Sequence, residues 1–346
     1  MSEVLHTHWK SPSNIALIKY WGKTGHQIPC NPSLSITLDQ AHTDTRIEAV
    51  PKQGDFPEPE LYFEGKRNLP FETKILGFFQ QISDRLPVVT SHKLLIHSEN
   101  SFPHSAGIAS SASAMSALAL GLCELQRQLD GGARDAAFFA LASDIARLGS
   151  GSASRSVYGG LVSWGKHVDL PESSNEVAAP LPFEVHEVFT KLHDDILILD
   201  RSPKKVSSRA GHGLMKGNLF SEVRFKQANQ HFSELLEALK TGDWDRFIAI
   251  TESEALSLHA MMLTSTPPYL LIQPQTVKII KELQDFRQQS GLPVCFTLDA
   301  GPNVHLIYPH TCREKVQELL SMWQNDSSFS FEVLPDVMGK GPICLK

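Results

Sequence analysis

Apolar runs that alternate with helix-like periodicity predict a chain of mixed α/β class. Apolar residues spaced three and four positions apart are typical of one helix face, whereas short continuous or alternating runs are typical of strands. The helical periodicity covers residues 73–86, 112–129, 135–148, 215–240, 243–262, 275–290 and 312–323. The strand-like runs cover residues 14–20, 34–38, 43–50, 93–97, 157–164, 195–200, 294–298, 304–308 and 328–334.

Turn-forming residues divide these elements. Residues 1–21 are predicted to form two short extended segments around a turn at 11–13, where Ser-Pro-Ser stands. The run at 43–50 is predicted to be the hairpin partner of the run at 34–38. Both predictions assume that strands in this part of the chain are short.

The length of the chain, 346 residues, is sufficient for two domains. A polar stretch with prolines at 167–187 is the predicted boundary between them. The prediction is therefore an N-terminal domain over 1–187 and a C-terminal domain over 188–346.

Charge and composition limit the partners. The formal net charge is −6 and 41% of the residues are hydrophobic, which gives no indication of nucleic-acid binding. No apolar run is long enough to span a bilayer, and the first ten residues lack a signal-peptide core. The five cysteines are scattered and form no C-x-x-C pair, which favours a reducing cytoplasm. We therefore expect a cytoplasmic protein with neither a nucleic-acid nor a membrane partner.

A candidate phosphate site lies between Asn100 and Leu120, in the stretch NSFPHSAGIASSASAMSALAL. The first N–H groups of a helix are unpaired and attract anions, and small residues let a phosphate approach the backbone. Ser110, Ser111 and Ser113 can donate to phosphate oxygens or cap the helix. An ordinary serine-capped core helix has the same pattern, so this stretch alone leaves both interpretations open.

Four other features each have a chemical and a structural interpretation. Lys19 stands in an apolar strand and either meets an anion there or reaches solvent from the strand end. The turn at 149–156 places Arg155 for a carboxylate or phosphate, or is a flexible connection. The basic loop at 201–213 either binds a polyanionic substrate tail or is solvated. Asp299 ends an apolar strand and is either a placed carboxylate or a turn former.

Together these features suit phosphoryl transfer from a nucleotide to a small, acidic, phosphorylated substrate. Six segments also carry a resemblance: SPSNIALIKYWGK (11–23), NSFPHSAGIASSASA (100–114), GSGSASRSVYGG (149–160), KKVSSRAG (204–211), STPPY (265–269) and FTLDAGPN (296–303). In wording, and for five of them in order, they are similar to the diphosphomevalonate decarboxylase family of the GHMP kinase group. The resemblance runs nearly end to end and implies a two-domain GHMP-kinase fold of α/β (α+β) class, with the active-site cleft between the domains.

The resemblance further implies a reaction that uses ATP and Mg²⁺. The γ-phosphoryl group moves to the tertiary 3-hydroxyl of mevalonate 5-diphosphate, and phosphate and carbon dioxide then leave, giving isopentenyl diphosphate. Loss of phosphate develops positive charge on the tertiary carbon, and the departing carboxylate quenches that charge. Such an enzyme must bind several anions while it keeps one carboxylate beside the hydroxyl.

Residue roles follow from the same resemblance. Asp299 is expected to be the base or orienter of the hydroxyl, Lys19 to lie near the reacting oxygen, and Arg155 to grip the substrate carboxylate. The substrate and its phosphates are expected to contact Asn14, Tyr20, Lys23, Ser150, Ser152, Arg155, Ser208 and Arg209. The ATP phosphates are expected to contact Ser105, Ala106, Gly107, Ala109, Ser110 and Ser111. No side chain is assigned as a metal ligand.

The chain departs from the family's usual wording at three positions. His104 stands where Thr is common, Ser154 where Cys is usual, and His212 where many members have Met. An imidazole beside the substrate tail could change the preferred number of phosphates. The hypothesis is that the 5-diphosphate is preferred, and the 5-monophosphate is the alternative.

Three rival functions remain at this stage. A GHMP-type kinase that stops at the phosphorylated product would share the fold, although the combination of Asp299, Arg155 and Lys19 favours decarboxylation. The S-x-x-K match at 202–205 is similar to penicillin-binding proteins, but its companion motifs are missing. A non-enzymatic nucleotide-binding module is the third. A homodimer is expected because the family is often dimeric.

Overall fold

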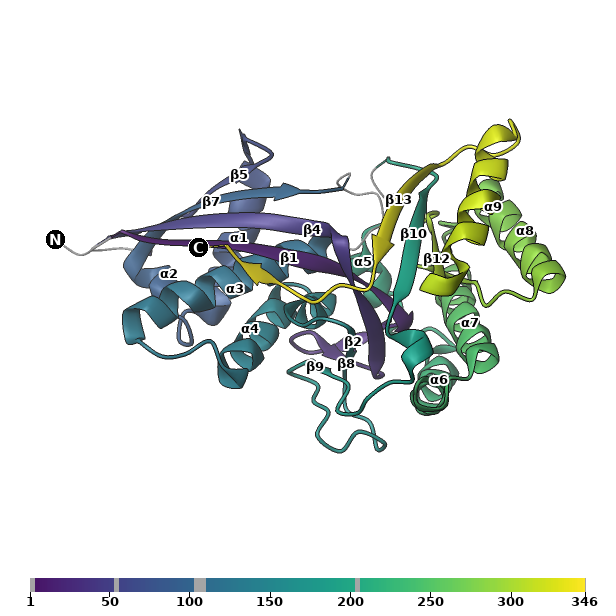
Figure 1. Cartoon of the computed structure of the whole chain (residues 1–346). Helices are drawn as coiled ribbons and strands as arrows, with labels where there is room; N and C mark the ends of the chain where they lie inside the picture. The colour runs from purple at the N-terminus through teal and green to yellow at the C-terminus, as the bar shows by residue number, and fades with distance from the viewer. Residues whose placement is uncertain (1–3, 53–55, 103–109, 203–205, 346) are drawn as a thin grey trace.

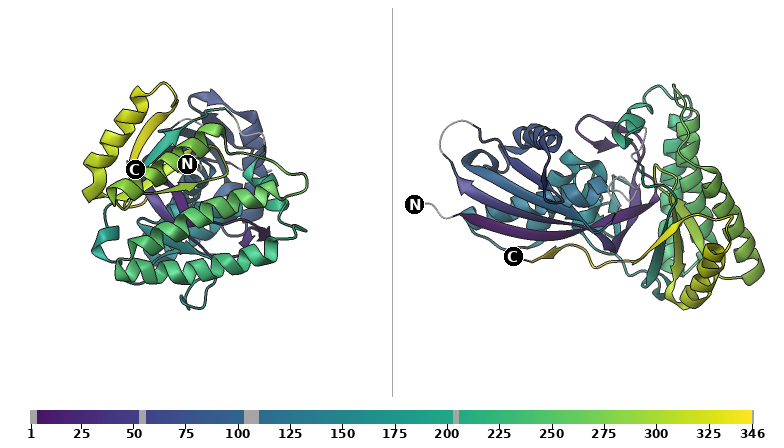
Figure 2. Two further views of the ribbon diagram at one scale, coloured as in Figure 1. Left: turned by 90° about the vertical axis from the view of Figure 1, so that its right-hand side faces the viewer. Right: turned by 90° about the horizontal axis from the view of Figure 1, so that it is seen from above.

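The computed structural model describes residues 4–52, 56–102, 110–202 and 206–345, with the side chain of Arg209 left aside. It confirms the mixed α/β class: within the described residues, two large, mostly antiparallel sheets stand side by side, each covered by helices (Figure 1). Residues 23–24 and 28–29 form a separate two-stranded sheet. The views in Figure 2 show the larger sheet and its helices beside the smaller sheet and its helices.

The larger sheet is built mainly on two long strands. Its order is β14 (Ile343–Cys344), β1 (Leu5–Ile18), β4 (Ser33–Pro51), β7 (His92–Asn100), β5 (Glu60–Phe63) and β6 (Lys66–Arg67). β4 also pairs with β8 (Leu161–Trp164), which pairs with β9 (Ala179–Pro180). The helices of this part are α1 (Leu69–Ile82), α2 (Val88–Ser91), α3 (Ser110–Asp130), α4 (Ala136–Gly149) and the 3₁₀ helix η1 (Gly151–Val157). α3 packs directly on β1 and β4.

The smaller sheet follows in the second part of the chain. Its order is β11 (Cys295–Leu298), β12 (Val304–Pro309), β10 (Leu192–Ile198) and β13 (Glu332–Val337), and all its pairs are antiparallel. Its helices are α6 (Ser221–Thr241), α7 (Trp244–Leu263), α8 (Pro274–Ser290) and α9 (Arg313–Asn325). Short elements complete the described chain: β2 (Lys23–Thr24), β3 (Ile28–Pro29), η2 (Glu187–Phe189), α5 (Ser208–Gly213) and η3 (His310–Cys312).

Local chemistry explains where several helices begin and end. The carboxylates of Asp135 and Asp243 accept hydrogen bonds from the backbone of the first turns of α4 and α7. Gly242 and Gly291 end α6 and α8 in the left-handed conformation, with φ values of 79° and 67°, where a side chain would be strained. These signals stand in the sequence, and the predicted limits of these helices lie within a few residues of the observed ones, except that α6 begins at Ser221 rather than 215.

The predicted turn at 11–13 is wrong. β1 runs through it as one strand, and the irregularity is instead a bulge: Pro12 pairs with His42 of β4, while Asn14 pairs with Thr37. A proline has no N–H to donate, and a bulge is a position where a strand tolerates that loss.

The predicted hairpin between 34–38 and 43–50 is also wrong, because both runs belong to the single strand β4. The buried carboxylate of Asp336 accepts hydrogen bonds from the backbone N–H groups of Asp39, Gln40 and Ala41, at 2.7–2.9 Å. These groups sit in the bulge, where they have left the strand ladder. The hydrogen bonds of a segment that is typical of a turn in the local sequence are therefore completed by a residue almost 300 positions away.

The apolar core extends from one sheet to the other. Ile15, Leu17 and Ile18, at the end of β1, belong to the same buried cluster as Phe232 of α6 and Phe247 of α7. The end of β1 thus enters the core of the second part of the molecule. Whatever follows Ile18 is consequently placed where the two sheets meet.

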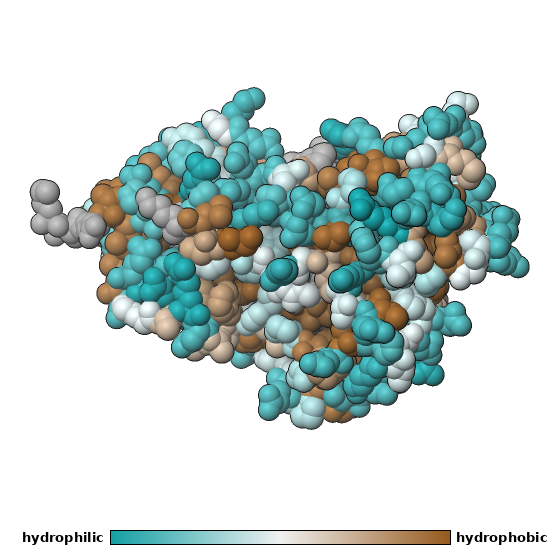
Figure 3. All heavy atoms as spheres, in the orientation of Figure 1, coloured by the Kyte–Doolittle hydropathy of each residue, from teal (hydrophilic) through white to brown (hydrophobic). Residues whose placement is uncertain are grey.

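The face of the molecule in Figure 3 is mostly polar. Hydrophilic residues cover most of the face in Figure 3, with smaller hydrophobic groups between them. Within the described ranges, no helix has the length and apolar character needed to cross a membrane.

Candidate active site

Lys19 follows the last residue of β1 and is almost completely buried, with 1% of its surface exposed. Its amine donates to the carbonyl of Ala16 at 2.5 Å, and it lies 3.9 Å from Oδ1 of Asp299. Burial lowers the pKa of Lys19 to about 8, and the negative charges of Asp299 and Glu254 oppose that fall. The lysine therefore meets an anion inside the protein and does not reach solvent.

Asp299 comes directly after β11, at the end of the smaller sheet. Its side chain keeps 27% of its surface exposed, and its backbone carbonyl lies 3.0 Å from the imidazole of buried His259. The β11 residue Thr297 also reaches β1, donating its hydroxyl to the carbonyl of Ala16 at 3.4 Å. The two strand ends are thus joined, and the carboxylate of Asp299 faces the lysine from an accessible position.

Arg155 lies in η1, so the prediction of a flexible turn at 149–156 is wrong: that 3₁₀ helix is largely buried. The guanidinium donates to Ser35 at 3.0 Å, to Ser33 at 2.7 Å and to Oδ1 of Asn14 at 3.3 Å. Burial lowers the pKa of Arg155 to about 10, and the charge of Asp299 opposes this, so the group remains a cation at neutral pH. Arg155, Asn14 and Asp299 form a connected polar region.

Aromatic rings lie beside these charges. The Tyr20 ring is 4.8 Å from the Trp164 ring, and burial raises the pKa of its phenol. The His212 ring lies 4.3 Å from Tyr20 and 4.5 Å from Trp21, and its Nδ1 accepts the backbone N–H of Gly22 at 3.0 Å. Burial, reinforced by the nearby positive charges of Lys23 and Arg155, lowers the pKa of His212 to about 3. The ring is therefore neutral at physiological pH.

The serine-rich segments approach one another. The hydroxyl of Ser150 lies 3.3 Å from that of Ser111, in the first turn of α3. The carbonyl of Ser152 accepts from the amide of Asn14 at 3.1 Å. The start of α3 thus adjoins the segment that carries Arg155, with Ser110 as the first residue of that helix.

The remaining predicted residues are less closely gathered. Lys23, in β2, donates to Gln27 at 2.6 Å, and its charge reaches His212. Ser208 is exposed in the first turn of α5. Four residues of the predicted ATP site lie outside the described residues: Ser105, Ala106, Gly107 and Ala109. His104, Lys205 and the side chain of Arg209 also lie outside them.

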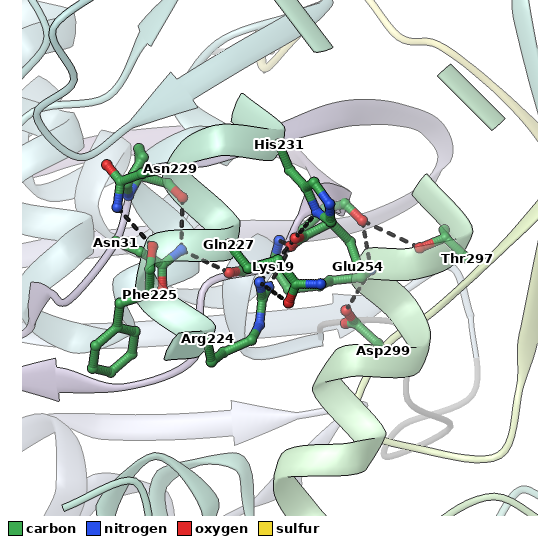
Figure 4. Close-up of polar contacts among 12 residues, drawn as sticks. Lys19, Asn31, Arg224, Phe225, Gln227, Asn229, His231, Glu254, Thr297 and Asp299 are labelled. Carbon is green, nitrogen blue, oxygen red and sulfur yellow. Dashed lines mark hydrogen bonds and ion pairs between the residues drawn. The ribbon is translucent and has the colours of Figure 1, made fainter. Parts of the chain in front are cut away.

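Sequence reasoning missed a buried acidic group behind Lys19 (Figure 4). Glu254 of α7, with 0% exposure, accepts the backbone N–H of Lys19 at 2.8 Å. Arg224 of α6 pairs with the same carboxylate through both terminal nitrogens, and Nδ1 of His231 lies 2.7 Å from it. Glu254 occupies a helix face among apolar residues, and no motif in the sequence distinguishes it.

It also missed the serines that hold Arg155. Ser33, Ser35 and Thr37 alternate with apolar residues along β4 and all lie buried on one strand face. That alternation was a signal, because it places three hydroxyls on the same side of a strand. Pro32, directly before Ser33, is typical of a turn and obscures this signal.

Two further observations concern a surface hollow and the possible ligands of a metal ion. A surface hollow of about 650 Å³, between the 166–173 loop and α6, has no predicted site residue in its lining. Among the described residues, no three His, Cys, Asp or Glu side chains are grouped to hold a metal ion. A magnesium ion here would take its ligands largely from substrate phosphates and water, as Mg²⁺ commonly does.

Comparisons with known proteins give a consistent result. Residues 11–176 match the family model for the diphosphomevalonate decarboxylase-like N-terminal domain, and residues 196–334 match that for the mevalonate 5-diphosphate decarboxylase C-terminal domain. The diphosphomevalonate decarboxylase of Candida albicans is 32% identical over 326 residues, covering 90% of this chain and 86% of the relative. The human enzyme of the same name is 31% identical over 315 residues, covering 85% and 74%.

Solved structures agree with these matches. The mevalonate diphosphate decarboxylase of Enterococcus faecalis, in a structure on its ATP binding mediated by mevalonate diphosphate, superposes with a TM-score of 0.83 at 28% identity, covering 99% of this chain and 100% of that one. A structure of MDDEF in complex with MVAPP, AMPPCP and magnesium gives the same TM-score, identity and coverage.

Proposed function

The chain belongs to the diphosphomevalonate decarboxylase family, and from this premise we propose that it decarboxylates mevalonate 5-diphosphate in an ATP-dependent reaction. The products are isopentenyl diphosphate, ADP, phosphate and carbon dioxide. The observation that carries the proposal in this chain is the approach of the Lys19 amine to within 3.9 Å of the Asp299 carboxylate, where the two sheets meet. The two-domain GHMP-kinase fold expected from the resemblance is confirmed by the structural matches.

The three charged residues divide the chemistry. Asp299 is accessible enough to touch the tertiary hydroxyl and accepts its proton or orients it for attack on the γ-phosphate. Lys19 offsets the negative charge that collects on the transferred group and the carboxylate. Arg155, held in place by Ser33 and Ser35, binds the substrate carboxylate until it leaves as carbon dioxide.

The phosphates have a separate set of contacts. We propose that Tyr20, Lys23, Ser208 and Arg209 hold the 5-diphosphate tail, and that Asn14, Ser150 and Ser152 line the acidic end of the substrate. ATP supplies the phosphoryl group, and Mg²⁺ would neutralise its phosphate oxygens. The N–H groups at the start of α3, with Ser110 and Ser111, would face the nucleotide phosphates.

A coupled assay tests the proposal. Purified protein is given ATP, Mg²⁺ and either mevalonate 5-diphosphate or mevalonate 5-phosphate, and ADP and carbon dioxide are followed together. We expect equal amounts of ADP and carbon dioxide and a higher kcat/KM for the diphosphate. A higher kcat/KM for the monophosphate would reverse the substrate assignment.

The other outcomes identify the rival functions. ADP without carbon dioxide would indicate a kinase that stops at the phosphorylated product. Nucleotide binding without either product would indicate a binding module. Each of these results would overturn the proposed decarboxylation.

Two broader properties belong to the same proposal. We propose a cytoplasmic homodimer: the family is often dimeric, and all five cysteines are free thiols, which suits a reducing compartment. Light scattering after size-exclusion chromatography would give the mass of the assembly. A mass equal to that of one chain would contradict the dimer.

A further inference from the structure

We propose that Glu254 is a positioning residue for this reaction: it fixes Lys19 beside Asp299 by accepting the backbone N–H of Lys19, and it places a second negative charge near the lysine amine. The inference rests on the proposed function, because it assigns a purpose to the position of Lys19. Glu254 itself lies behind the lysine backbone and has no predicted contact with substrate (Figure 4).

The backbone of Lys19 is held on both sides. Its N–H donates to Oε2 of Glu254 at 2.8 Å, and its carbonyl accepts from the amide of Asn31 at 2.9 Å. Because Lys19 lies one residue beyond the last residue of β1, it has left the strand ladder that would otherwise fix it. Glu254 replaces that ladder contact with one from α7, a helix that packs on both β1 and β11.

The same helix, α7, therefore helps to position both reacting groups, Lys19 and Asp299. β11 leads directly to Asp299, and α7 contacts β11 along its length while Glu254 reaches across to Lys19. His259, five residues further along α7, has its imidazole 3.0 Å from the backbone carbonyl of Asp299. A single rigid element thus contacts the backbones of Lys19 and Asp299.

The contacts of Glu254 are not those expected of a group kept for stability. Its carboxylate is completely buried and pairs with Arg224, whose Nε has no hydrogen-bond partner within the described residues. Buried ion pairs commonly contribute no more stability than apolar residues of similar size. The bond from Lys19 gives this costly group a different purpose.

Charge makes the proposal testable. The groups that act on the Lys19 amine are Asp299, Glu254 and Asp194, which favour its cation, and Arg155, which opposes it. Glu254 in turn is faced by Arg224 and His231 of α6. Burial raises the pKa of Glu254, but the His231 contact and the charge of Arg224 outweigh it, so the carboxylate is ionised.

Glu254→Gln is the first variant, because its amide oxygen can still accept from Lys19 while the charge is lost. We expect the alkaline limb of the kcat profile, near pH 8 in the wild type, to move roughly 0.5–1 pH unit lower. The titration of the buried Lys19 amine, followed by NMR of the protein carrying ¹³C-enriched lysine, should move in the same direction. The KM for ATP should stay unchanged.

Glu252→Gln is the matched control. Glu252 lies on the same helix and pairs with Arg287 at 2.6 Å, so this variant also removes a largely buried acidic charge from an arginine pair. It has no contact with Lys19 among the described interactions, and we expect no movement of the alkaline limb or of the NMR titration curve of Lys19. Equal shifts in both variants would overturn the proposal.

A second variant covers the case in which Glu254→Gln fails to fold. Arg224→Met combined with Glu254→Leu removes both buried charges together, which preserves stability better than removing one. It also removes the acceptor for the backbone N–H of Lys19, so we expect kcat to fall tenfold or more in a protein that still folds, with a modestly lower melting temperature. Wild-type kcat in this variant would overturn the positioning role. The NMR titration of Lys19 needs no turnover, so it decides the role of Glu254 even if the wild type proves not to be a decarboxylase.

Discussion

Lys19 and Arg155 are both cations enclosed by protein, and each stays charged through different partners. Lys19 depends on the nearby carboxylates of Asp299 and Glu254, whereas Arg155 is held by uncharged oxygens of two serines and an asparagine. The Arg155 guanidinium stays charged beside uncharged partners because its ordinary pKa is far above neutral pH. Loss of one carboxylate therefore affects the lysine more than the arginine.

Asp299→Asn tests the reacting carboxylate. We expect kcat to fall by about 10³-fold or more, because an amide cannot accept the hydroxyl proton, while the affinity for ATP changes little. Steady-state kinetics and nucleotide titration measure the two effects. Near wild-type kcat in this variant would remove Asp299 from the chemistry.

His212 affects stability in acid rather than the charge of the site. The unfolded chain binds a proton at His212 below about pH 6.5, whereas the folded protein keeps the ring neutral down to about pH 3. Acidification from pH 7 to 5 therefore favours unfolding at this residue by about 2 kcal/mol.

His212→Met should remove the part of the acid destabilisation that comes from the titration of His212. We expect the melting temperature of the variant to fall less than that of the wild type between pH 7 and 5. The lost acceptor for Gly22 lowers both values equally, so the difference between the two pH values isolates the titration. Identical pH dependence in both proteins would contradict the burial of a neutral ring.

Single-residue chemistry was predictable where a charged residue interrupts an apolar run. Lys19 and Asp299 stand out in this way, and the structure brings them together. Glu254 and Ser33 could not be assigned, because a buried glutamate on a helix and a serine after a proline are ordinary in isolation. Their roles arise from partners far away in sequence.

At the scale of elements, the bulge in β4 depends on one carboxylate. Asp336→Ala leaves four backbone N–H groups without their acceptor, three in the bulge and that of Val337, and we expect the free energy of unfolding to fall by about 2–4 kcal/mol. Chemical denaturation measures this loss. Asp326→Ala is the control: it removes an exposed carboxylate that accepts hydrogen bonds from Ser328, and it should change stability by about 0.5 kcal/mol or less.

Helices were more predictable than strands in this chain. Caps such as Asp135 and Gly291 act within a few residues, so their effect is visible in the local sequence. The continuity of β1 and β4 is decided instead by pairing between them and by Asp336, and neither is visible locally. This is why the turn predicted in β1 and the hairpin turn predicted in β4 are both absent, and a bulge between the two strands stands in their place.

At the scale of the whole molecule, a strand near the C-terminus pairs with the first strand of the chain. β14, close to the C-terminus, pairs with Trp9 and Lys10 of β1, and the N–H of Leu345 donates to the carbonyl of His8 at 2.8 Å. The pairing covers an edge of the larger sheet that would otherwise be open. The division into domains over 1–187 and 188–346 remains a proposal, and this final strand returns to the sheet of the first part.

Removal of residues 343–346 tests that closure. We expect a loss of about 1–3 kcal/mol of stability, because several backbone hydrogen bonds disappear. Activity at low temperature should persist, since the residues of β1 that pair with β14, Trp9 and Lys10, stand nine or more positions before Lys19. Ile343→Ala, which keeps the backbone pairing of a half-exposed residue, should be milder, and an unchanged melting temperature on truncation would show that the strand is dispensable.

The passage of β1 from one core into the other has a consequence for biosynthesis. Ile15–Ile18 leave the ribosome early, yet the residues that enclose them, such as Phe232 and Phe247, are translated more than 200 residues later. The nascent chain must carry this apolar segment without these later partners for most of its synthesis, and exposed apolar surface of this kind attracts chaperones. The reacting lysine next to it gains the carboxylates of Glu254 and Asp299 only late in translation, so a product that ends before these two residues would be inactive.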